Sequence, residues 1–270
     1  MNSRTKPLQI AVIALLICEV GFCQGFRHNN NSNKVSVANN VSQTPPAFAA
    51  LIERVRLAQL ANKNLRNYEL VREYRISGEG HNSIQADVTA TLDFSPAKNT
   101  YTVEKHDGSP RGTEVVRRIL DHEVESSSAK SKTDSGLALT TANYDFSYGG
   151  EAILDGNPCF LLGLAPKRKD KELIAGQAWI DKSTFEVRRI EGDLAKSPSM
   201  WIKKVYVAIT FGDVGGNWLQ TSLNAKADVR FIGTQTLTSN LVDFQTPEEV
   251  AQKSFATAHV PGFSAFRQHP

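Results

Sequence analysis

The sequence predicts a mainly β fold of the α+β type, in which one wide antiparallel sheet is accompanied by two helices. Most of the chain after Asn67 divides into short stretches rich in β-branched and aromatic residues, separated by Gly, Pro, Asn and Asp. Connections such as Asp155-Gly156-Asn157-Pro158 and Gly215-Gly216-Asn217 are short. Short turns join antiparallel neighbours, because a parallel crossover needs a longer segment. Such a wide sheet can curl, and two helices can cover one of its faces.

The alternation of apolar and polar side chains along the chain supports the prediction of strands. The clearest case is the stretch from Ile202 to Phe211, where Val205, Val207, Ile209 and Phe211 share one face. The expected strands are Tyr68–Ser77, Ile84–Phe94, Asn99–His106, Tyr144–Leu154, Cys159–Ala165, Ile174–Asp181, Phe185–Glu191, Ile202–Phe211, Trp218–Asp228 and Val229–Phe244.

Helical spacing occurs in two stretches. From Phe48 to Leu65, apolar residues such as Leu51 and Val55 recur with Arg, Lys and Gln between them. From Glu114 to Ser126 a second apolar stripe predicts another helix. Each stripe needs a surface to pack against, and the sheet supplies it.

The N-terminal segment has the layout of a secretory signal peptide. Residues Arg4 and Lys6 precede an apolar run from Leu8 to Cys18, which is about half the length that a membrane-spanning helix needs. Small residues precede a cut before Gln24. We therefore expect a signal peptide over residues 1–23 and export to the periplasm. Phe22 before Cys23 fits the lipobox of a bacterial lipoprotein badly. Lipidation of Cys23, which would anchor the protein to the outer membrane, is kept as the alternative.

Composition divides the rest of the chain into three parts. Residues 24–46 are rich in Asn, Ser and Gln and are expected to form a polar linker. Residues 47–246 are expected to form one domain, and residues 247–270 a flexible tail. The net charge is only +3, from 31 basic and 28 acidic residues, which predicts no nucleic-acid partner. After cleavage Cys159 would be the single cysteine, so no internal disulfide is expected.

Motifs for catalysis are absent from the sequence. It contains no phosphate-binding Walker loop, no His-Glu-x-x-His and no Gly-x-Ser-x-Gly. The triplet Asp121-His122-Glu123 cannot converge on one atom, because consecutive helical residues point in different directions. We interpret it as a solvated helix face. The sequence thus predicts a protein that is not an enzyme and has no catalytic residue, metal site or cofactor.

One succession of segments is more specific than composition. It consists of Phe160–Pro166, then Gly176–Asp181 with its Trp-Ile-Asp end, then Ser183–Gly192, and finally Val214–Leu219. It resembles the LolA/LolB-like group of outer-membrane lipoprotein-sorting proteins, which includes the sensor domain of RseB. The resemblance covers roughly Tyr68 to Phe244.

The resemblance implies an incomplete barrel whose helices cover an apolar concave cavity that accepts acyl chains of lipids or lipoproteins. Envelope membrane proteins are further partners that it suggests, and lipoprotein or lipid trafficking is the implied role. The alternative is a periplasmic sensor or protein-binding module that transports nothing. The expected cavity-lining residues are Trp179, Phe185, Val187, Val205, Val207, Ile209, Phe211 and Trp218.

Overall fold

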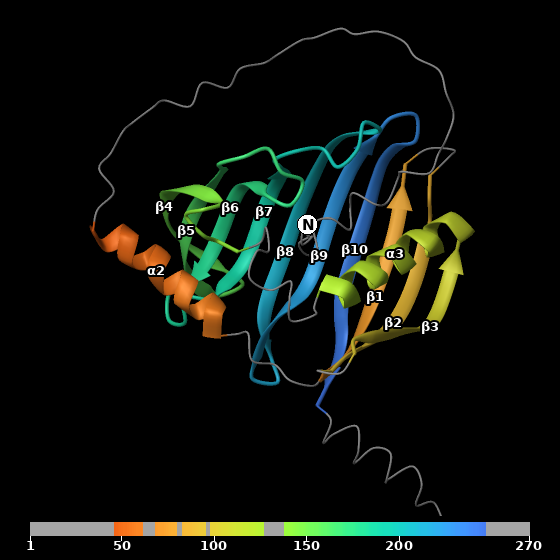
Figure 1. Cartoon of the computed structure of the whole chain (residues 1–270), viewed down its shortest axis with the longest axis horizontal. Coiled ribbons are helices and arrows are strands. Elements are labelled where there is room, and N and C mark those ends of the chain that lie inside the picture. Colours follow the sequence, from red (N-terminus) through yellow and green to blue (C-terminus); the bar gives the residue numbers. More distant parts are fainter. Residues whose placement is uncertain (1–45, 62–67, 80–82, 96–97, 127–137, 247–270) are drawn as a thin grey trace, which may run out of the picture.

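Ten antiparallel strands and two helices make up the part of the chain that the computed structural model describes, residues 46–61, 68–79, 83–95, 98–126 and 138–246 (Figure 1). The helices are α2 (Pro46–Ala61) and α3 (Pro110–Ser126). The strands are β1 (Tyr68–Gly78), β2 (Ala86–Phe94), β3 (Thr100–Gly108), β4 (Tyr144–Leu154), β5 (Asn157–Pro166), β6 (Ile174–Asp181), β7 (Val187–Leu194), β8 (Ile202–Val214), β9 (Asn217–Val229) and β10 (Gly233–Gln245).

The strands form a single open sheet in the order β3-β2-β1-β10-β9-β8-β7-β6-β5-β4. All paired strands are consecutive in the sequence except β1 and β10, so the last strand joins the N-terminal three strands to the rest. β3 and β4 are the two edges, and the sheet does not close between them (Figure 1). The predicted wide antiparallel sheet, curled into an incomplete barrel, is confirmed.

One face of the sheet carries the core. The pairing register aligns a continuous row of small and apolar residues across all ten strands, because side chains of directly paired residues point to the same side. This row is Gly108, Ala86, Ile76, Leu237, Ala225, Val207, Gly192, Gly176, Leu164 and Phe146. The row belongs to the concave face.

Two facing glycines bring β6 and β7 close together in that row. A Cβ on Gly176 would lie 2.0 Å from the carbonyl oxygen of Glu191, and one on Gly192 would lie 2.3 Å from that of Ala175. Gly192 also has a φ of 152°. Any larger side chain at either position would force the two strands apart, so these glycines permit the tight curl of this part of the sheet.

Both helices cover the concave face, as predicted. Helix α3 lies across β1, β2 and β3 in Figure 1, and it buries Val116, Ile119 and Leu120. Helix α2 lies at the other side of the sheet, where it buries Leu51 and Val55 and brings the ring of Phe48 to 6.1 Å from that of Tyr148 on β4. In each helix the buried residues are three or four positions apart, which places them on one face of the helix.

Element boundaries differ from the predicted ones mainly at strand ends. The strand expected to end at His106 continues through Gly108, and Gly108 with a φ of 102° then leads into α3. Strand β8 extends through Val214, so the glycine-rich turn is confined to Gly215 and Gly216. The signal peptide, the polar linker and the C-terminal tail fall outside the described residues and stay predictions. Among the described helices, none is long and apolar enough to span a membrane.

Candidate functional site

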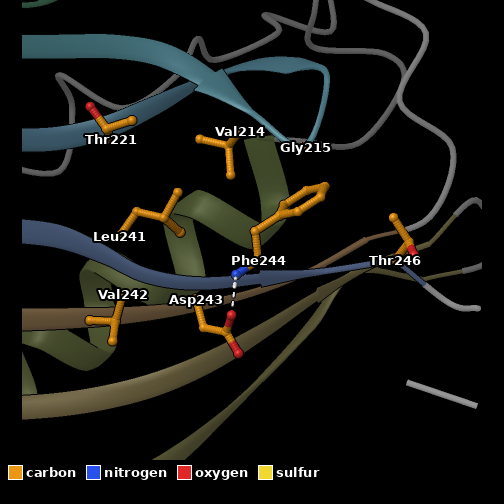
Figure 2. Close-up of a pocket in the computed structure, with 8 residues that line it drawn as sticks. All are labelled: Val214, Gly215, Thr221, Leu241, Val242, Asp243, Phe244 and Thr246. Atoms are coloured by element: carbon orange, nitrogen blue, oxygen red, sulfur yellow. Dashed lines mark hydrogen bonds between the residues drawn. The ribbon is translucent and has the colours of Figure 1, made fainter. Parts of the chain in front are cut away.

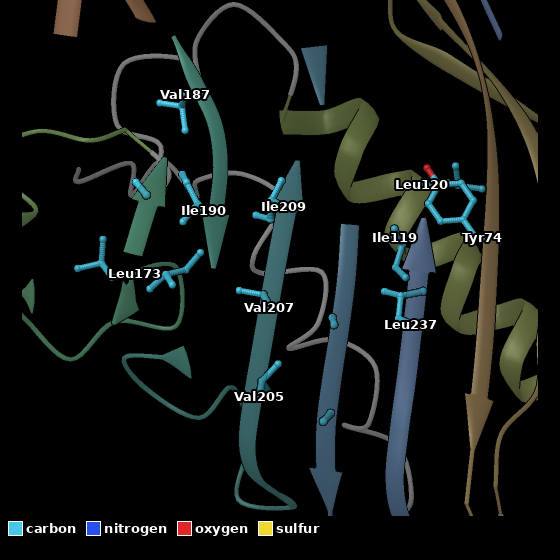
Figure 3. Packing of buried hydrophobic residues seen from close by; sticks show 14 of the residues in the cluster. Tyr74, Ile119, Leu120, Leu173, Val187, Ile190, Val205, Val207, Ile209 and Leu237 are labelled. Carbon is cyan, nitrogen blue, oxygen red and sulfur yellow. The ribbon is translucent and has the colours of Figure 1, made fainter. Parts of the chain in front are cut away.

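The middle of the concave face is apolar and fully enclosed. Val205, Val207 and Ile209 of β8 are each at most 2% exposed, and Val187 of β7 is 6% exposed. Figure 3 shows these side chains pointing into one cluster that continues to Leu237 of β10 and to α3. The structure therefore brings together four of the residues that were expected to line a cavity.

Three other expected residues gather at the end of the sheet that holds the β6–β7 and β8–β9 turns. Phe211 packs partly buried against the core. The indole of Trp218 reaches β7, where its Nε1 donates a hydrogen bond of 2.9 Å to the carbonyl oxygen of Val187. Phe185 lies in the β6–β7 turn, stacks on Phe160 and lies under the guanidinium of Arg54 from α2.

Trp179 lies on the opposite face of the sheet. Its neighbours Ala178 and Ile180 are fully buried on the concave side, and strand alternation turns Trp179 away from them. Its ring lies beneath the guanidinium of Arg189, at 5.8 Å from the ring centre. We therefore leave Trp179 out of the candidate cavity.

A pocket of about 520 Å³ opens at the end of the sheet where the β8–β9 hairpin and the last residues of β10 face each other (Figure 2). Ligand pockets in proteins typically enclose ~300–1,000 Å³. Its walls are Val214, Gly215, Thr221, Leu241, Val242, Asp243, Phe244 and Thr246. Apart from Asp243 and two threonines the lining residues are apolar or glycine, but the surface that they expose to the pocket is more polar than apolar, which suits a ligand with both apolar and polar parts.

The pocket exists because β9 and β10 separate. Their pairing runs from Gly233↔Val229 to Asn240↔Ser222 and continues no further, although β10 extends to Gln245. A bulge on each side accompanies the separation, one where β9 pairs with β8 and one where β10 pairs with β1. Gly215 fits closely against Phe244, since a Cβ at Gly215 would lie 2.7 Å from that ring.

A buried polar cluster adjoins the pocket. Arg72 of β1 is 2% exposed, and its guanidinium donates a 2.7 Å hydrogen bond from Nη2 to the carbonyl oxygen of Gln220, next to the point where β9 leaves β10. Arg72 Nε lies 3.3 Å from Oε1 of Glu123 on α3, and Tyr74 donates a 2.8 Å hydrogen bond to the same carboxylate. Arg72 pairs in register with Leu241, which lines the pocket.

Besides Arg72 Nε, which faces the Glu123 carboxylate as an ion pair, two atoms of this cluster retain unused hydrogen-bonding capacity. Arg72 Nη1 and Gln220 Oε1 are buried and have no hydrogen-bond partner among the described residues. A buried polar group without a partner is costly, so this donor and this acceptor beside the pocket are available to pair with polar atoms of a ligand. Burial, followed by the nearby Glu123 charge, raises the pKa of Tyr74 well above its usual value, so its hydroxyl remains a donor.

Sequence reasoning missed this cluster and placed Glu123 wrongly. Asp121-His122-Glu123 was expected to be a solvated helix face, and Asp121 is indeed exposed, but Glu123 is only 7% exposed. Glu123 follows Val116 by seven residues and therefore lies on the buried stripe of α3. Arg72 likewise occupies an inward position between Leu70 and Tyr74. On both elements the sequence does contain a signal for the buried pair: a charged residue stands at a position where the spacing of the apolar residues predicts a buried side chain.

Two carboxyl groups elsewhere have strongly shifted pKa values, and they lie at opposite ends of the sheet. Burial, with the neighbouring Asp170, raises the pKa of Glu172 to about 7 in the β5–β6 loop. At Asp181, burial acts to raise the pKa, but hydrogen bonds from Ser183, Thr184 and Arg188 outweigh it and hold the pKa below its usual range. Within the described part of the chain, no group of three or more His, Cys, Asp or Glu could hold a metal ion. These two carboxyls cannot act on one reacting atom.

Replacing Glu172 by glutamine is expected to stabilise the protein at alkaline pH. The folded carboxyl binds its proton more tightly than the unfolded one, so stability falls as pH rises from about 4.5 to about 7. The glutamine variant lacks this fall and should be about 3 kcal/mol more stable than the wild type at about pH 8, with little difference at about pH 4. Urea unfolding at both pH values measures it, and an equal difference at both would contradict the assignment.

Comparison with known proteins shows likeness only at the level of structure. No protein-family model and no curated protein matches the sequence. A domain from Vibrio parahaemolyticus described as an outer membrane lipoprotein-sorting protein is similar with a TM-score of 0.42 and 11% identity, over 77% of this chain and 96% of that chain. A protein of the DUF1329 family from Desulfovibrio piger has a TM-score of 0.37 and 14% identity, over 74% and 92% of the two chains. A LolA superfamily protein from Nitrosomonas europaea has a TM-score of 0.31 and 10% identity, over 77% and 98%. Structures similar to this chain thus include members of the group that the sequence resembles.

Proposed function

We propose that the protein is exported to the cell envelope and binds an acyl chain of a lipid or lipoprotein, with the pocket between β9 and β10 as the entrance. The observation that carries the proposal is the pocket itself, which is about 520 Å³ in volume and combines the side chains of Val214, Leu241 and Phe244 with exposed polar atoms. It lies at one end of a buried apolar face that spans the whole sheet. The N-terminal layout of a signal peptide supports the location.

The walls of the pocket suit an apolar chain. Val214, Leu241 and Phe244 present aliphatic and aromatic surface, and each methylene removed from water there contributes ~0.8 kcal/mol. Binding of this kind requires no catalytic group, and its specificity comes from pocket shape and a few polar atoms. Val205, Val207, Ile209 and Val187 form the deep apolar surface toward which a longer chain would extend.

The polar cluster suits the oxygen-bearing end of such a ligand. Arg72 Nη1 can donate to an ester or carboxylate oxygen, and Gln220 Oε1 can accept from a hydroxyl or amide. Glu123 already balances the charge of Arg72, so a neutral ester is accommodated without leaving a buried charge unpaired. The ligand class is therefore an amphiphile with a long apolar part and an ester, amide or acid group.

Native mass spectrometry of protein purified without detergent, followed by organic extraction, tests the proposal. We expect discrete added masses that extract as phospholipid or as acyl chains. Thr221→Trp, which places a large ring in the pocket, should weaken binding by about ten-fold, because excluding two methylenes costs about 1.6 kcal/mol.

Thr236→Trp is the matched control. Thr236 is also a half-buried strand threonine, but it lies on the convex face of β10, between the concave residues Gln235 and Leu237. Its ligand load should equal that of the wild type. A protein mass that stays bare after incubation with phospholipid vesicles and with a lipopeptide would exclude the acyl-binding proposal and favour a protein-binding module.

A further inference from the structure

Three connections form a continuous rim at the end of the sheet opposite the pocket. They are the β5–β6 loop (residues 167–173), the β7–β8 loop (residues 195–201) and the β9–β10 turn (residues 230–232). Backbone hydrogen bonds join them, from Ala195 N to Leu173 O at 2.8 Å and from Arg230 N to Trp201 O at 2.8 Å. We call these three segments the rim. Figure 1 shows the last two of them close together at the top of the view.

Large apolar side chains project from this rim. Phe231 is 88% exposed and Met200 is 77% exposed, and they are among the most exposed large hydrophobic residues that the structure describes. The ring of Trp201 lies 6.1 Å from that of Phe231, so the three form one patch across two loops. Phe231 has a φ of 66°, a conformation that bulky residues rarely adopt. The turn thus maintains an unfavourable backbone conformation at a side chain that packs against little of the protein.

Basic residues surround the patch. The rim contains six basic residues and two acidic ones, a surplus of four, whereas the entire chain has a net charge of only +3. The six are Lys167, Arg168, Lys169, Lys171, Lys196 and Arg230, and all are exposed. One of the two acidic residues, Asp170, pairs with Arg168 at 3.3 Å, and the other, Glu172, is buried.

The turns at the pocket end differ in both respects. Residues 155–156, 182–186 and 215–216 contain one basic and two acidic residues. The large apolar side chain there, Phe185, is half-buried between Phe160 and Arg54 instead of projecting. Among these described turns, positive charge and exposed aromatic surface therefore coincide in the rim and not in the three turns at the pocket end.

We propose that the rim docks on a lipid membrane surface that carries anionic headgroups, with Phe231 and Met200 inserted among the acyl chains. Apolar side chains ringed by Lys and Arg are the arrangement by which proteins lie on such a surface: the apolar part enters the interface and the basic part attracts the headgroups. A protein partner would be expected to meet a flatter, less charged patch. The membrane contact is independent of the ligand pocket, which lies at the other end of the sheet.

Vesicle flotation tests the proposal on the full protein. We expect binding to vesicles of phosphatidylcholine with phosphatidylglycerol, weaker binding to pure phosphatidylcholine, and loss of most binding at high salt. The double variant Met200→Gln with Phe231→Asn should bind the anionic vesicles about ten-fold more weakly. Asparagine is chosen because it tolerates a positive φ. Lys169→Glu with Lys171→Glu should reduce binding to anionic vesicles and leave the weak binding to neutral ones unchanged.

Ile153→Asn is the matched control, because Ile153 is also 77% exposed but lies beside the β4–β5 turn at the pocket end. All variants share the same N-terminal segment, so any membrane binding by that segment is common to them. Fluorescence gives a second readout: Trp201 should shift to the blue on anionic vesicles, and Trp201→Phe should abolish the shift. Absence of vesicle binding, or equal loss in the double variant and in Ile153→Asn, would overturn the proposal. A failed ligand-load experiment would leave it standing.

Discussion

Glu123→Ala is expected to lower the free energy of unfolding by about 3–5 kcal/mol, the largest loss among the changes considered for this protein. The carboxylate balances the charge of Arg72, which is 2% exposed, and accepts the hydrogen bond of Tyr74. Without it, a guanidinium stays buried with the carbonyl oxygen of Gln220 as its partner. Urea unfolding followed by circular dichroism measures the difference.

The exposed pair Arg75–Asp87 provides the control. It lies on the other face of β1, with atoms 2.8 Å apart and side chains 66% and 50% exposed. Asp87→Ala should cost less than about 1 kcal/mol, since exposed ion pairs are weak. A loss at Glu123 no larger than the loss at Asp87 would show that Arg72 is hydrated in solution.

Replacing both Arg72 and Glu123 by apolar residues separates their effect on protein stability from their effect on ligand binding. Arg72→Met combined with Glu123→Leu fills similar volumes with apolar groups and should recover most of the stability lost by Glu123→Ala. The same double variant removes the Nη1 donor beside the pocket. We therefore expect it to be folded and yet to bind ester-containing amphiphiles more weakly, while simple hydrocarbon probes bind as before.

Sequence alone was sufficient for the fold and for the middle of the concave face. Alternation along Ile202–Phe211 correctly placed Val205, Val207 and Ile209 on the buried side, because strand periodicity is a local property. The same rule places Trp179, another of the residues expected to line the cavity, on the opposite face, because its neighbours Ala178 and Ile180 are the buried ones.

The pocket and its polar cluster depend on contacts between distant segments. Arg72 and Glu123 lie on β1 and α3, and neither residue is recognisable as half of a buried pair until the helix is placed on the sheet. The pocket exists because the β9–β10 ladder stops at Ser222↔Asn240. Nothing in the composition of these two strands marks that point, since their residues remain compatible with pairing beyond it.

The second large effect is expected at Asp181, where the Trp-Ile-Asp segment ends. One carboxylate accepts hydrogen bonds from Ser183 N at 2.8 Å and Thr184 N at 3.0 Å, and it also pairs with the Ser183 hydroxyl and with Arg188. Asp181→Ala removes all of these and should lower the free energy of unfolding by about 3 kcal/mol. Asp181→Asn keeps an acceptor for the backbone but loses the charge that pairs with Arg188, so its loss should be about half as large.

The pH dependence of this loss distinguishes the charge from the shape of the side chain. Because the folded pKa of Asp181 lies below its unfolded value of about 3.8, the carboxylate stabilises the protein fully above that value, and the contribution declines as the pH falls below it. The gap between wild type and Asp181→Asn should therefore be constant from about pH 5 to pH 8 and shrink below about pH 4. Asp145→Ala, at a 74% exposed position, should show almost no gap. A gap at Asp181 that does not change with pH would mean that packing and not the carboxylate charge holds the turn.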